Sequence, residues 1–321
     1  MLRNSSDQDH TPLGPGAEFD RIRRALARLG PNASGAGDDC AFIQVGAERL
    51  ALSCDLTVEG THFRTGWLAP VEQGWRATAA ALSDLAAVAA RPLGVLTSVA
   101  VPAEWPEEHF ADLMEGVGEA ARSAGAAVWG GDLVRADRVI VDVMVAGRLD
   151  GEPARRSGAR VGDELWVTGL LGGPFHAVAA WNAGTEPEAT ARARFAHPVP
   201  RVEEALWLKE HGVRAMIDLS DGLVPDAGHL AAASGVGVTL DPDQVPLHPA
   251  VEVVDEALVS GEEYELLVAL PPGAGASAAQ AFRAAFDLPL TRVGVVEQGA
   301  GVQVRRRSGP VTAPPSFTHF H

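Results

Sequence analysis

The stretch VEQGWRATAAALSDLAAVAA (residues 71–90) constrains the fold more than any other part of the chain. Its small and apolar side chains predict a long alanine-rich helix that can pack closely against its neighbours. Asp84 interrupts a run, residues 77–90, that should otherwise be buried. Because burying a lone carboxylate is costly, Asp84 is the most informative acidic residue in the chain.

Helices and strands alternate on both sides of this stretch. An amphipathic helix containing Phe19, Ile22, Leu26 and Leu29 is predicted to end at Gly30-Pro31. Before residue 150, strands are predicted near 49–54, 97–101, 127–129 and 139–147, and a further helix over 106–124. After it, helices are predicted over 174–183, 202–211, 223–233 and 276–285, and strands near 164–168, 215–217, 236–240, 264–270 and 292–296.

A composition shift at residues 150–153, Asp-Gly-Glu-Pro, divides the pattern. We therefore predict a flexible tail over 1–16, an N-terminal domain over 17–150 and a C-terminal domain over 151–321. The tail has no apolar segment typical of a signal peptide.

Composition excludes several classes of protein. The 321 residues are 46% hydrophobic and carry a formal net charge of −16, which argues against disorder, a nucleic-acid surface or an anionic membrane as partner. Two cysteines, Cys40 and Cys54, are too few for a disulfide scaffold or a cysteine-ligated zinc site, and favour the cytoplasm. Lys209 is the only lysine and is followed by Glu210, so a Walker A loop and the usual protein-kinase lysine are both missing.

The acidic residues concentrate beside glycines and at predicted strand ends, where side chains and backbone amides can converge on a ligand. The sites are Gly37-Asp38-Asp39, Ser53-Cys54-Asp55, Ser83-Asp84, Gly130-Gly131-Asp132 and Asp218-Leu219-Ser220-Asp221-Gly222. Any single one could be a helix cap or turn former; Asp221 could cap a helix that starts at Leu223. Taken together, hard oxygen ligands without histidine or cysteine spacing favour Mg²⁺, which usually completes its shell with phosphate oxygens and water. This combination indicates a nucleotide site.

The remaining chemistry-bearing residues add little by themselves. The ten histidines are dispersed without metal-binding spacing, and His62, after a glycine turn, is as compatible with a structural hydrogen bond as with a ligand contact. Neither a G-x-S-x-G nucleophile elbow nor a G-x-G-x-x-G loop occurs. A serine hydrolase and a dinucleotide-binding protein therefore have no support.

Seven short motifs, in order, resemble the thiamine-monophosphate kinases, a family within the aminoimidazole-ribonucleotide-synthetase-like ATP-binding superfamily. They are Gly37-Asp38-Asp39-Cys40-Ala41, Asp55 with Val58-Glu59-Gly60-Thr61-His62-Phe63, Leu82-Ser83-Asp84-Leu85-Ala86-Ala87, Gly130-Gly131-Asp132, Arg156-Ser157-Gly158-Ala159, Asp218-Leu219-Ser220-Asp221-Gly222-Leu223 and Gly261-Glu262-Glu263-Tyr264-Glu265-Leu266. The match runs from about residue 18 to the C-terminus. The E-G-x-H-F element separates this kinase from its superfamily relatives.

The resemblance implies two α+β domains, N-terminal sheets that pair across a homodimer, and transfer of phosphate from ATP to thiamine monophosphate. It assigns Mg²⁺ ligation to Asp39, Ser53, Cys54, Asp55, Asp84, Asp132, Asp218 and Asp221, of which Asp84, Asp132 and Asp221 are the expected catalytic residues. It assigns ATP contacts to Gly131, Asp132, Arg156 and Ser220, and the thiamine-monophosphate pocket to His62, Glu262 and Phe317.

The chain departs from the family pattern at a few positions. Ser260-Gly261-Glu262-Glu263-Tyr264 stands where the family usually has G-G-E-D-Y, and Cys54 stands where threonine is usual, so a metal contact there would come from its backbone carbonyl. Phe317-Thr318-His319-Phe320 replaces the usual aromatic-Asp-His-Phe.

The expected chemistry suits these residues. A phosphate monoester is already ionised near neutral pH, so in-line transfer needs charge neutralisation rather than a protein nucleophile. Mg²⁺ and Arg156 would supply it. The alternatives are another ATP-using member of the superfamily, such as an aminoimidazole ribonucleotide synthetase, or a non-catalytic protein that binds nucleotide or thiamine phosphate.

Overall fold

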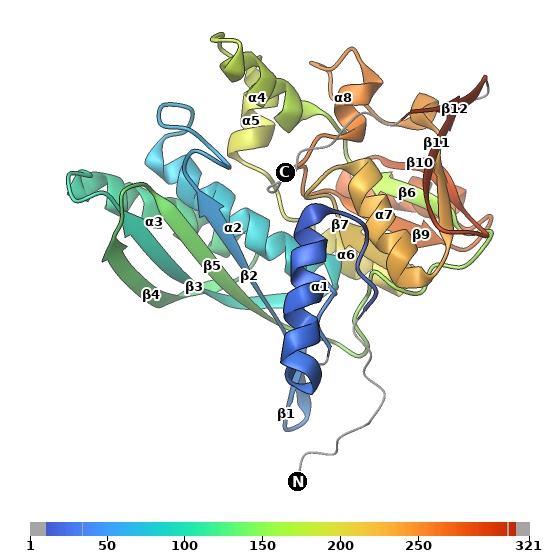
Figure 1. Ribbon diagram of the computed structural model, residues 1–321, viewed down its shortest axis with the longest axis horizontal. Coiled ribbons are helices and arrows are strands. Elements are labelled where there is room, and N and C mark those ends of the chain that lie inside the picture. The colour runs from blue at the N-terminus through green and yellow to red at the C-terminus, as the bar shows by residue number, and fades with distance from the viewer. Residues whose placement is uncertain (1–10, 34, 307, 313–321) are drawn as a thin grey trace.

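Two mixed sheets lie side by side in the computed structural model, which describes residues 11–33, 35–306 and 308–312 (Figure 1). The N-terminal sheet has the order β1-β2-β5-β3-β4 and the C-terminal sheet the order β12-β11-β8-β10-β6-β9-β7. In each sheet one pair of neighbours is parallel, β3 with β4 and β11 with β8, and the others are antiparallel. This architecture confirms the predicted α+β fold class.

The strands of the N-terminal sheet are β1 (Ala41–Val45), β2 (Glu48–Val58), β3 (Arg91–Val101), β4 (Ala127–Arg135) and β5 (Ile140–Arg148). Those of the C-terminal sheet are β6 (Glu164–Thr168), β7 (Ala215–Asp218), β8 (Gly237–Leu240), β9 (Leu266–Leu270), β10 (Leu290–Glu297), β11 (Gly301–Arg306) and β12 (Gly309–Val311).

The helices are α1 (Ala17–Leu29), α2 (Pro70–Ala87), α3 (Glu107–Ser123), α4 (Gly173–Asn182), α5 (Ala189–Ala196), α6 (Val202–Glu210), α7 (Leu223–Ser234), α8 (Val254–Leu258) and α9 (Gly275–Phe286), with short 3₁₀ turns η1 (Gly30–Ala33) and η2 (Pro242–Gln244). Within the described part of the chain, none of them combines the length and the apolar character that a membrane crossing requires.

The alanine-rich stretch forms α2, which belongs to both halves of the molecule. It packs with α3 on one face of the N-terminal sheet (Figure 1). Its C-terminal end contacts β7 and α6 of the other half, where Ala86 and Ala89 join the core of the C-terminal sheet. Gly74 of α2 and Gly116 of α3 lie against the backbone of the opposing helix, where a Cβ atom would not fit. Small side chains thus let α2 approach its neighbours closely and carry Asp84 to the junction.

The two sheets differ in how they are covered. In β5 the alternate residues Val141, Val143 and Val145 are fully buried beneath α2, as expected for a strand with one face on a core. All nine residues of β4 are exposed. In the C-terminal sheet every residue of β7 and β9 is buried. The N-terminal sheet therefore keeps an open side, whereas β7 and β9 of the C-terminal sheet are covered on both faces.

Several predicted elements differ from the structure. β4 continues through Gly130, Gly131 and Asp132 to Arg135, although the glycines predicted an end after Trp129. Gly131 passes so close to the Thr97 carbonyl of β3 that a side chain would collide with it, so this glycine permits pairing rather than ending it. The strand predicted from Tyr264 begins at Leu266, because Tyr264 has a left-handed φ of 53°. The strands β1, β11 and β12 and the helices α5 and α8 were not predicted.

Helix α1 ends at Leu29, as predicted, but none of its residues is buried. On its apolar stripe Leu29 is 54% exposed, and the ring of Phe19 lies 4.0 Å from that of His229. Of the predicted tail, residues 1–10 lie outside the described chain; the Thr11 amide donates to the Ala36 carbonyl (3.2 Å).

Candidate active site

Asp84 lies where α2 passes beneath β2. Side chains alternate along a strand, so Ser53 and Asp55 share one side of β2 and Cys54 has the other. The Ser53 hydroxyl donates to Asp84 Oδ2 (2.5 Å). The buried Cys40 thiol donates to the Asp84 backbone carbonyl (3.3 Å). The residue that interrupts the alanine run is thus a carboxylate held by a serine hydroxyl of β2.

Asp84 is one of three aspartates whose carboxylate oxygens all lie within 4.8 Å of one another. Asp39 comes from the loop before β1 and Asp218 from the end of β7, and we call Asp39, Asp84 and Asp218 the aspartate cluster. The Ser83 hydroxyl donates to Asp218 Oδ2 (2.6 Å), and the Arg156 guanidinium donates to Asp39 Oδ1 (2.6 Å). Both halves of the molecule therefore contribute to one acidic centre.

The electrostatics of this centre are unfavourable without a cation. Burial raises the pKa of Asp218 to about 7, with a further contribution from the negative charge of Asp39. Burial, Asp142 and Asp221 raise the pKa of Asp55 to about 6. The pKa of Asp84 is raised well above its ordinary value by withdrawal from water and then by Asp55 and Asp218. These carboxyl groups favour protonation when no cation neutralises them.

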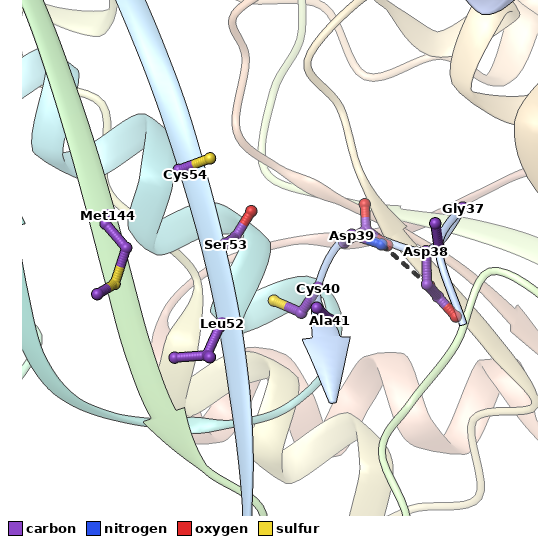
Figure 2. A pocket seen from close by; sticks show the side chains of 10 residues that line it. Gly37, Asp38, Asp39, Cys40, Ala41, Leu52, Ser53, Cys54 and Met144 are labelled. Carbon is purple, nitrogen blue, oxygen red and sulfur yellow. Dashed lines mark hydrogen bonds between the residues drawn. The ribbon is translucent and has the colours of Figure 1, made fainter. Parts of the chain in front are cut away.

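The residues present fit a divalent cation of the magnesium type. Asp39 Oδ2 is buried and has no hydrogen-bond partner among the described residues. The donor atoms are carboxylate and hydroxyl oxygens, which hard cations prefer. A pocket of about 380 Å³ opens beside the cluster, between the loop that carries Asp38 and Asp39 and the strand β2 that carries Ser53 and Cys54 (Figure 2).

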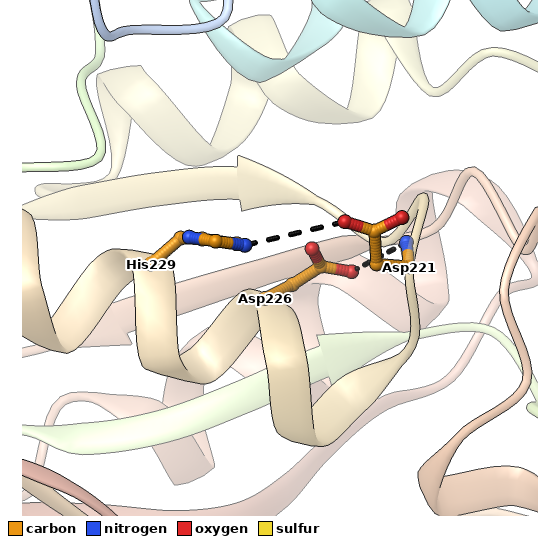
Figure 3. Close-up of side chains that lie close together, drawn as sticks. All are labelled: Asp221, Asp226 and His229. Carbon is orange, nitrogen blue, oxygen red and sulfur yellow. Dashed lines mark hydrogen bonds and ion pairs between the residues drawn. The ribbon is translucent and has the colours of Figure 1, made fainter. Parts of the chain in front are cut away.

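A second acidic group follows β7. Ligand atoms of Asp221, Asp226 and His229 lie within 4.8 Å of one another, with His229 Nε2 directed at Asp221 Oδ2 (4.0 Å; Figure 3). Asp221 does not cap α7, because Gly222 occupies the N-cap position. The buried Asp226 carboxylate instead accepts the backbone N–H groups of Asp221 (3.1 Å) and Gly222 (3.0 Å). Asp226 thereby fixes the loop that presents Ser220 and Asp221.

The loop before β9 is tied to this same segment. The Glu262 amide donates to the Ser220 carbonyl (2.7 Å) and the Tyr264 amide to the Leu219 carbonyl (2.9 Å). Glu262 has a φ of 62°, a left-handed conformation that is strained for a residue other than glycine and that concentrates at functional sites. The Glu262 carboxylate forms an ion pair with Arg76 of α2. The predicted nucleotide residue Ser220 and the predicted acceptor residue Glu262 therefore belong to one hydrogen-bonded unit.

Three predicted residues lie elsewhere or outside the described chain. Gly131 and Asp132 are exposed on the edge strand β4, separated from β2 by β5 and β3, and the aspartate cluster does not include them. Phe317 is outside the described residues. His62 lies in the turn after β2, where its Nδ1 accepts the Val58 amide (3.0 Å).

Comparison with known proteins identifies the family. Residues 37–149 match the model of the N-terminal domain of AIR synthase related proteins, and residues 160–307 match that of their C-terminal domain. The chain is 38% identical over 229 residues to the thiamine-monophosphate kinase of Mycobacterium tuberculosis, covering 71% of this chain and 69% of the relative. It is 33% identical over 295 residues to that of Methanopyrus kandleri, covering 89% and 90%.

The chain belongs to the thiamine-monophosphate kinase family. Its fold agrees: the structure of AaThiL complexed with AMPPCP and TMP superposes with a TM-score of 0.83 at 27% identity, covering 94% of this chain and 97% of that one. The resemblance predicted from the seven motifs is confirmed.

Within this thiamine-monophosphate kinase fold, one chain brings together Asp39, Ser53, Asp55, Asp84, Asp218 and Arg156, while the loops bearing Ser220, Asp221 and Glu262 join one another. Sequence analysis missed Asp226, His229 and Arg76. Asp226 and His229 are buried polar residues in the apolar pattern of α7, and Arg76 directly precedes the alanine run, so charge inside an apolar helix was the available signal.

Proposed function

We propose that this protein transfers the γ-phosphoryl group of ATP to the phosphate of thiamine monophosphate, giving ADP and thiamine diphosphate. The observation that carries the proposal is the aspartate cluster, an acidic centre at the junction of the two halves. The homologous kinases and the complex of AaThiL with AMPPCP and TMP support the identity of the two substrates.

We assign the binding of Mg²⁺ to the side chains of Asp39, Ser53, Asp55, Asp84, Asp218 and Asp221, and to the backbone carbonyl of Cys54. Bound there, the ion would neutralise the charges of two polyanionic substrates that otherwise repel each other. Arg156, held against Asp39, would add a bidentate contact to a phosphate oxygen. Ser220 would contact ATP, and His62, Glu262 and Phe317 would bind the acceptor.

The transfer itself needs little proton chemistry. An oxygen of the acceptor phosphate forms the new bond to the γ-phosphorus as the bond from that phosphorus to the bridging oxygen of ADP breaks. The acceptor oxygen is already ionised near neutral pH, so no general base is required. The chain's own contribution is alignment, through the hydrogen bonds that join the Ser220 loop to the Glu262 loop.

We also propose a homodimer formed by the open side of the N-terminal sheet. Apolar side chains are exposed on β4, among them Trp129 and Val134, and Leu56 is exposed on β2. An apolar surface of this kind indicates a protein contact. Gly131 and Asp132 lie on the same strand, so a second copy placed there would lie next to these two predicted ATP residues. Light scattering of the purified protein tests the dimer.

We propose that the protein acts in the cytoplasm. Both cysteines are free thiols, Cys40 buried and Cys54 exposed, which suits a reducing compartment. Cell fractionation followed by immunodetection measures this location directly.

The decisive experiment incubates the purified protein with Mg-ATP and thiamine monophosphate and follows products by chromatography and phosphorus NMR. Formation of ADP and thiamine diphosphate in equal amounts is expected. A parallel reaction with an aminoimidazole ribonucleotide precursor distinguishes the superfamily relatives. Equilibrium binding of both ligands without any diphosphate product would contradict the proposal and favour a non-catalytic binding protein.

A further inference from the structure

Arg76 is a buried cation within the contact between the two halves. Its side chain is 2% exposed. Its guanidinium carbon lies 3.8 Å from the centroid of the Phe195 ring on α5, and one nitrogen donates to the Phe195 backbone carbonyl (2.6 Å). The other terminal nitrogen forms the ion pair with Glu262. The guanidinium thus joins α5, through the ring and carbonyl of Phe195, to the loop that carries Glu262.

Glu262 has the properties of a residue that needs such a partner. Its backbone is strained at φ 62°, and its side chain remains 25% exposed, so the carboxylate can still face a ligand. A strained residue persists only where surrounding contacts hold it in place. The Glu262 amide is held by its hydrogen bond to the Ser220 carbonyl, and the Glu262 carboxylate is held by its ion pair with Arg76.

The position of Arg76 relative to the aspartate cluster is set by helix α2, which carries both Arg76 and Asp84. It precedes Asp84 by eight residues on the same helix, which is about 12 Å along the helix axis. Helix α2 therefore carries a residue of the aspartate cluster at one point and the partner of Glu262 two turns earlier. A rigid element of this kind fixes the distance between metal-binding and acceptor-binding groups.

We propose that Arg76 is a positioning residue for Glu262, and through it for the acceptor substrate. It acts on the binding of thiamine monophosphate and leaves ATP binding unchanged. This inference rests on the proposed function, because it takes Glu262 as an acceptor-binding residue.

The chain supplies a matched control. Arg192 of α5 pairs with Glu72 of α2 through two hydrogen bonds (2.7 and 2.8 Å), so it joins the same two helices and, like Arg76, forms an ion pair with a glutamate. Within the described part of the chain its hydrogen bonds go to Glu72 and to the Trp67 carbonyl, not to Glu262 or the aspartate cluster, and its side chain is 36% exposed. A purely structural role for Arg76 predicts that equivalent changes at Arg76 and Arg192 alter kinetics alike.

The test measures steady-state kinetics and thermal unfolding for Arg76→Gln, Arg76→Lys and Arg192→Gln. Arg76→Gln is expected to raise the KM for thiamine monophosphate about 30-fold with the KM for ATP within about twofold, because a charge-paired contact is lost. Arg76→Lys restores the positive charge without the planar fork and should bring the KM to within about fivefold of wild type. Arg192→Gln should leave both KM values unchanged.

A double-mutant cycle completes the test. Because it uses Arg76→Lys, it can be carried out even if Arg76→Gln does not fold. In a Glu262→Gln background, Arg76→Lys is expected to have less than a twofold effect, since its partner is gone. Equal effects of the Arg76 and Arg192 variants, or equal changes in both KM values, would overturn the inference while leaving the proposed function intact. If wild type forms no diphosphate, calorimetric titration with thiamine monophosphate replaces the kinetics, and absence of binding overturns both proposals.

Discussion

Two clusters of buried acidic residues lie near the junction of the two halves, and they differ in how far arginines neutralise them. Glu263 and Glu265, before β9, are 1% exposed and lie against Arg194 and Arg201; we call these four residues the arginine-paired cluster. Arg201 makes two hydrogen bonds to Glu265 (2.6 and 2.9 Å), and Arg194 donates to the same carboxylate (3.0 Å). Here two carboxylates meet two guanidinium groups.

The aspartate cluster has no such balance. Its three carboxylates have one close guanidinium, that of Arg156, which contacts Asp39. A buried carboxylate that lacks a cation is destabilising, so its persistence points to a ligand that completes the charge. The difference separates carboxylates that are neutralised within the chain from carboxylates to which we assign a metal ion, although both groups are buried and close to glycines.

The largest expected effect is a loss of catalysis when Asp84 of the aspartate cluster is replaced. Asp84→Asn should lower kcat/KM for thiamine diphosphate formation at least about 1,000-fold, which corresponds to about 4 kcal/mol of transition-state stabilisation. The fold should survive, because the amide removes a repelling charge and can still accept from Ser53. Product assays at saturating Mg²⁺ and thermal unfolding measure the two effects. Retained activity in a folded variant would remove Asp84 from the site.

The arginine-paired cluster should respond in the opposite way. Arg201→Met is expected to reduce the free energy of unfolding by about 3 kcal/mol, because Glu265 loses two charge-assisted hydrogen bonds in a buried position. Urea denaturation gives this value, and the KM values of whatever protein remains folded should stay near wild type. A variant with normal stability and impaired turnover would place Arg201 in the catalytic machinery instead.

Sequence distinguished these two clusters only in part. The run of small side chains over residues 71–90 and its interruption by Asp84 identified α2 and one member of the aspartate cluster, because both are local properties of one element. Arg201 and Glu265 are 64 positions apart, and Arg76 and Glu262 are 186 apart; such pairs depend on how α5, α6 and β9 are placed against α2, which no local period encodes. The resemblance to a family located Glu262, whereas its partner became visible only in three dimensions.

The strands show the same limit. Alternation predicted β2 and β5, where one face is buried and one is open. It failed for β4, whose glycines resemble a turn but allow close pairing with β3. Helical spacing predicted α1 correctly, yet the apolar stripe of this helix has no buried residue. Periodicity shows which face of a helix is apolar but not which element covers that face.

The pH dependence of stability should depend on the metal. The folded pKa of Asp218, about 7, lies above its ordinary 3.8, so the stabilisation from protonation is complete below pH 3.8 and is lost as pH rises towards 7. Without Mg²⁺, the free energy of unfolding should therefore fall by about 3 kcal/mol between pH 5 and 8. Saturating Mg²⁺ should flatten this fall, since the cation replaces the proton. Denaturation curves with and without the ion measure it, and identical slopes would contradict a cation site.

The smallest effect tests how complete the arginine pairing is. Burial raises the pKa of Glu263 to about 7 despite the opposing charge of Arg194. The stabilisation that comes from protonated Glu263 is therefore complete below its unfolded pKa near 4.5, and it is lost as the pH rises through 7. Glu263→Gln imitates the protonated form and can still accept the Gly172 amide. We expect little change in stability at pH 5 and a gain of about 2 kcal/mol at pH 8, measured by urea denaturation. A loss at pH 8 would show that Arg194 compensates the Glu263 charge fully, and the contrast between the two clusters would then be sharper than the pKa indicates.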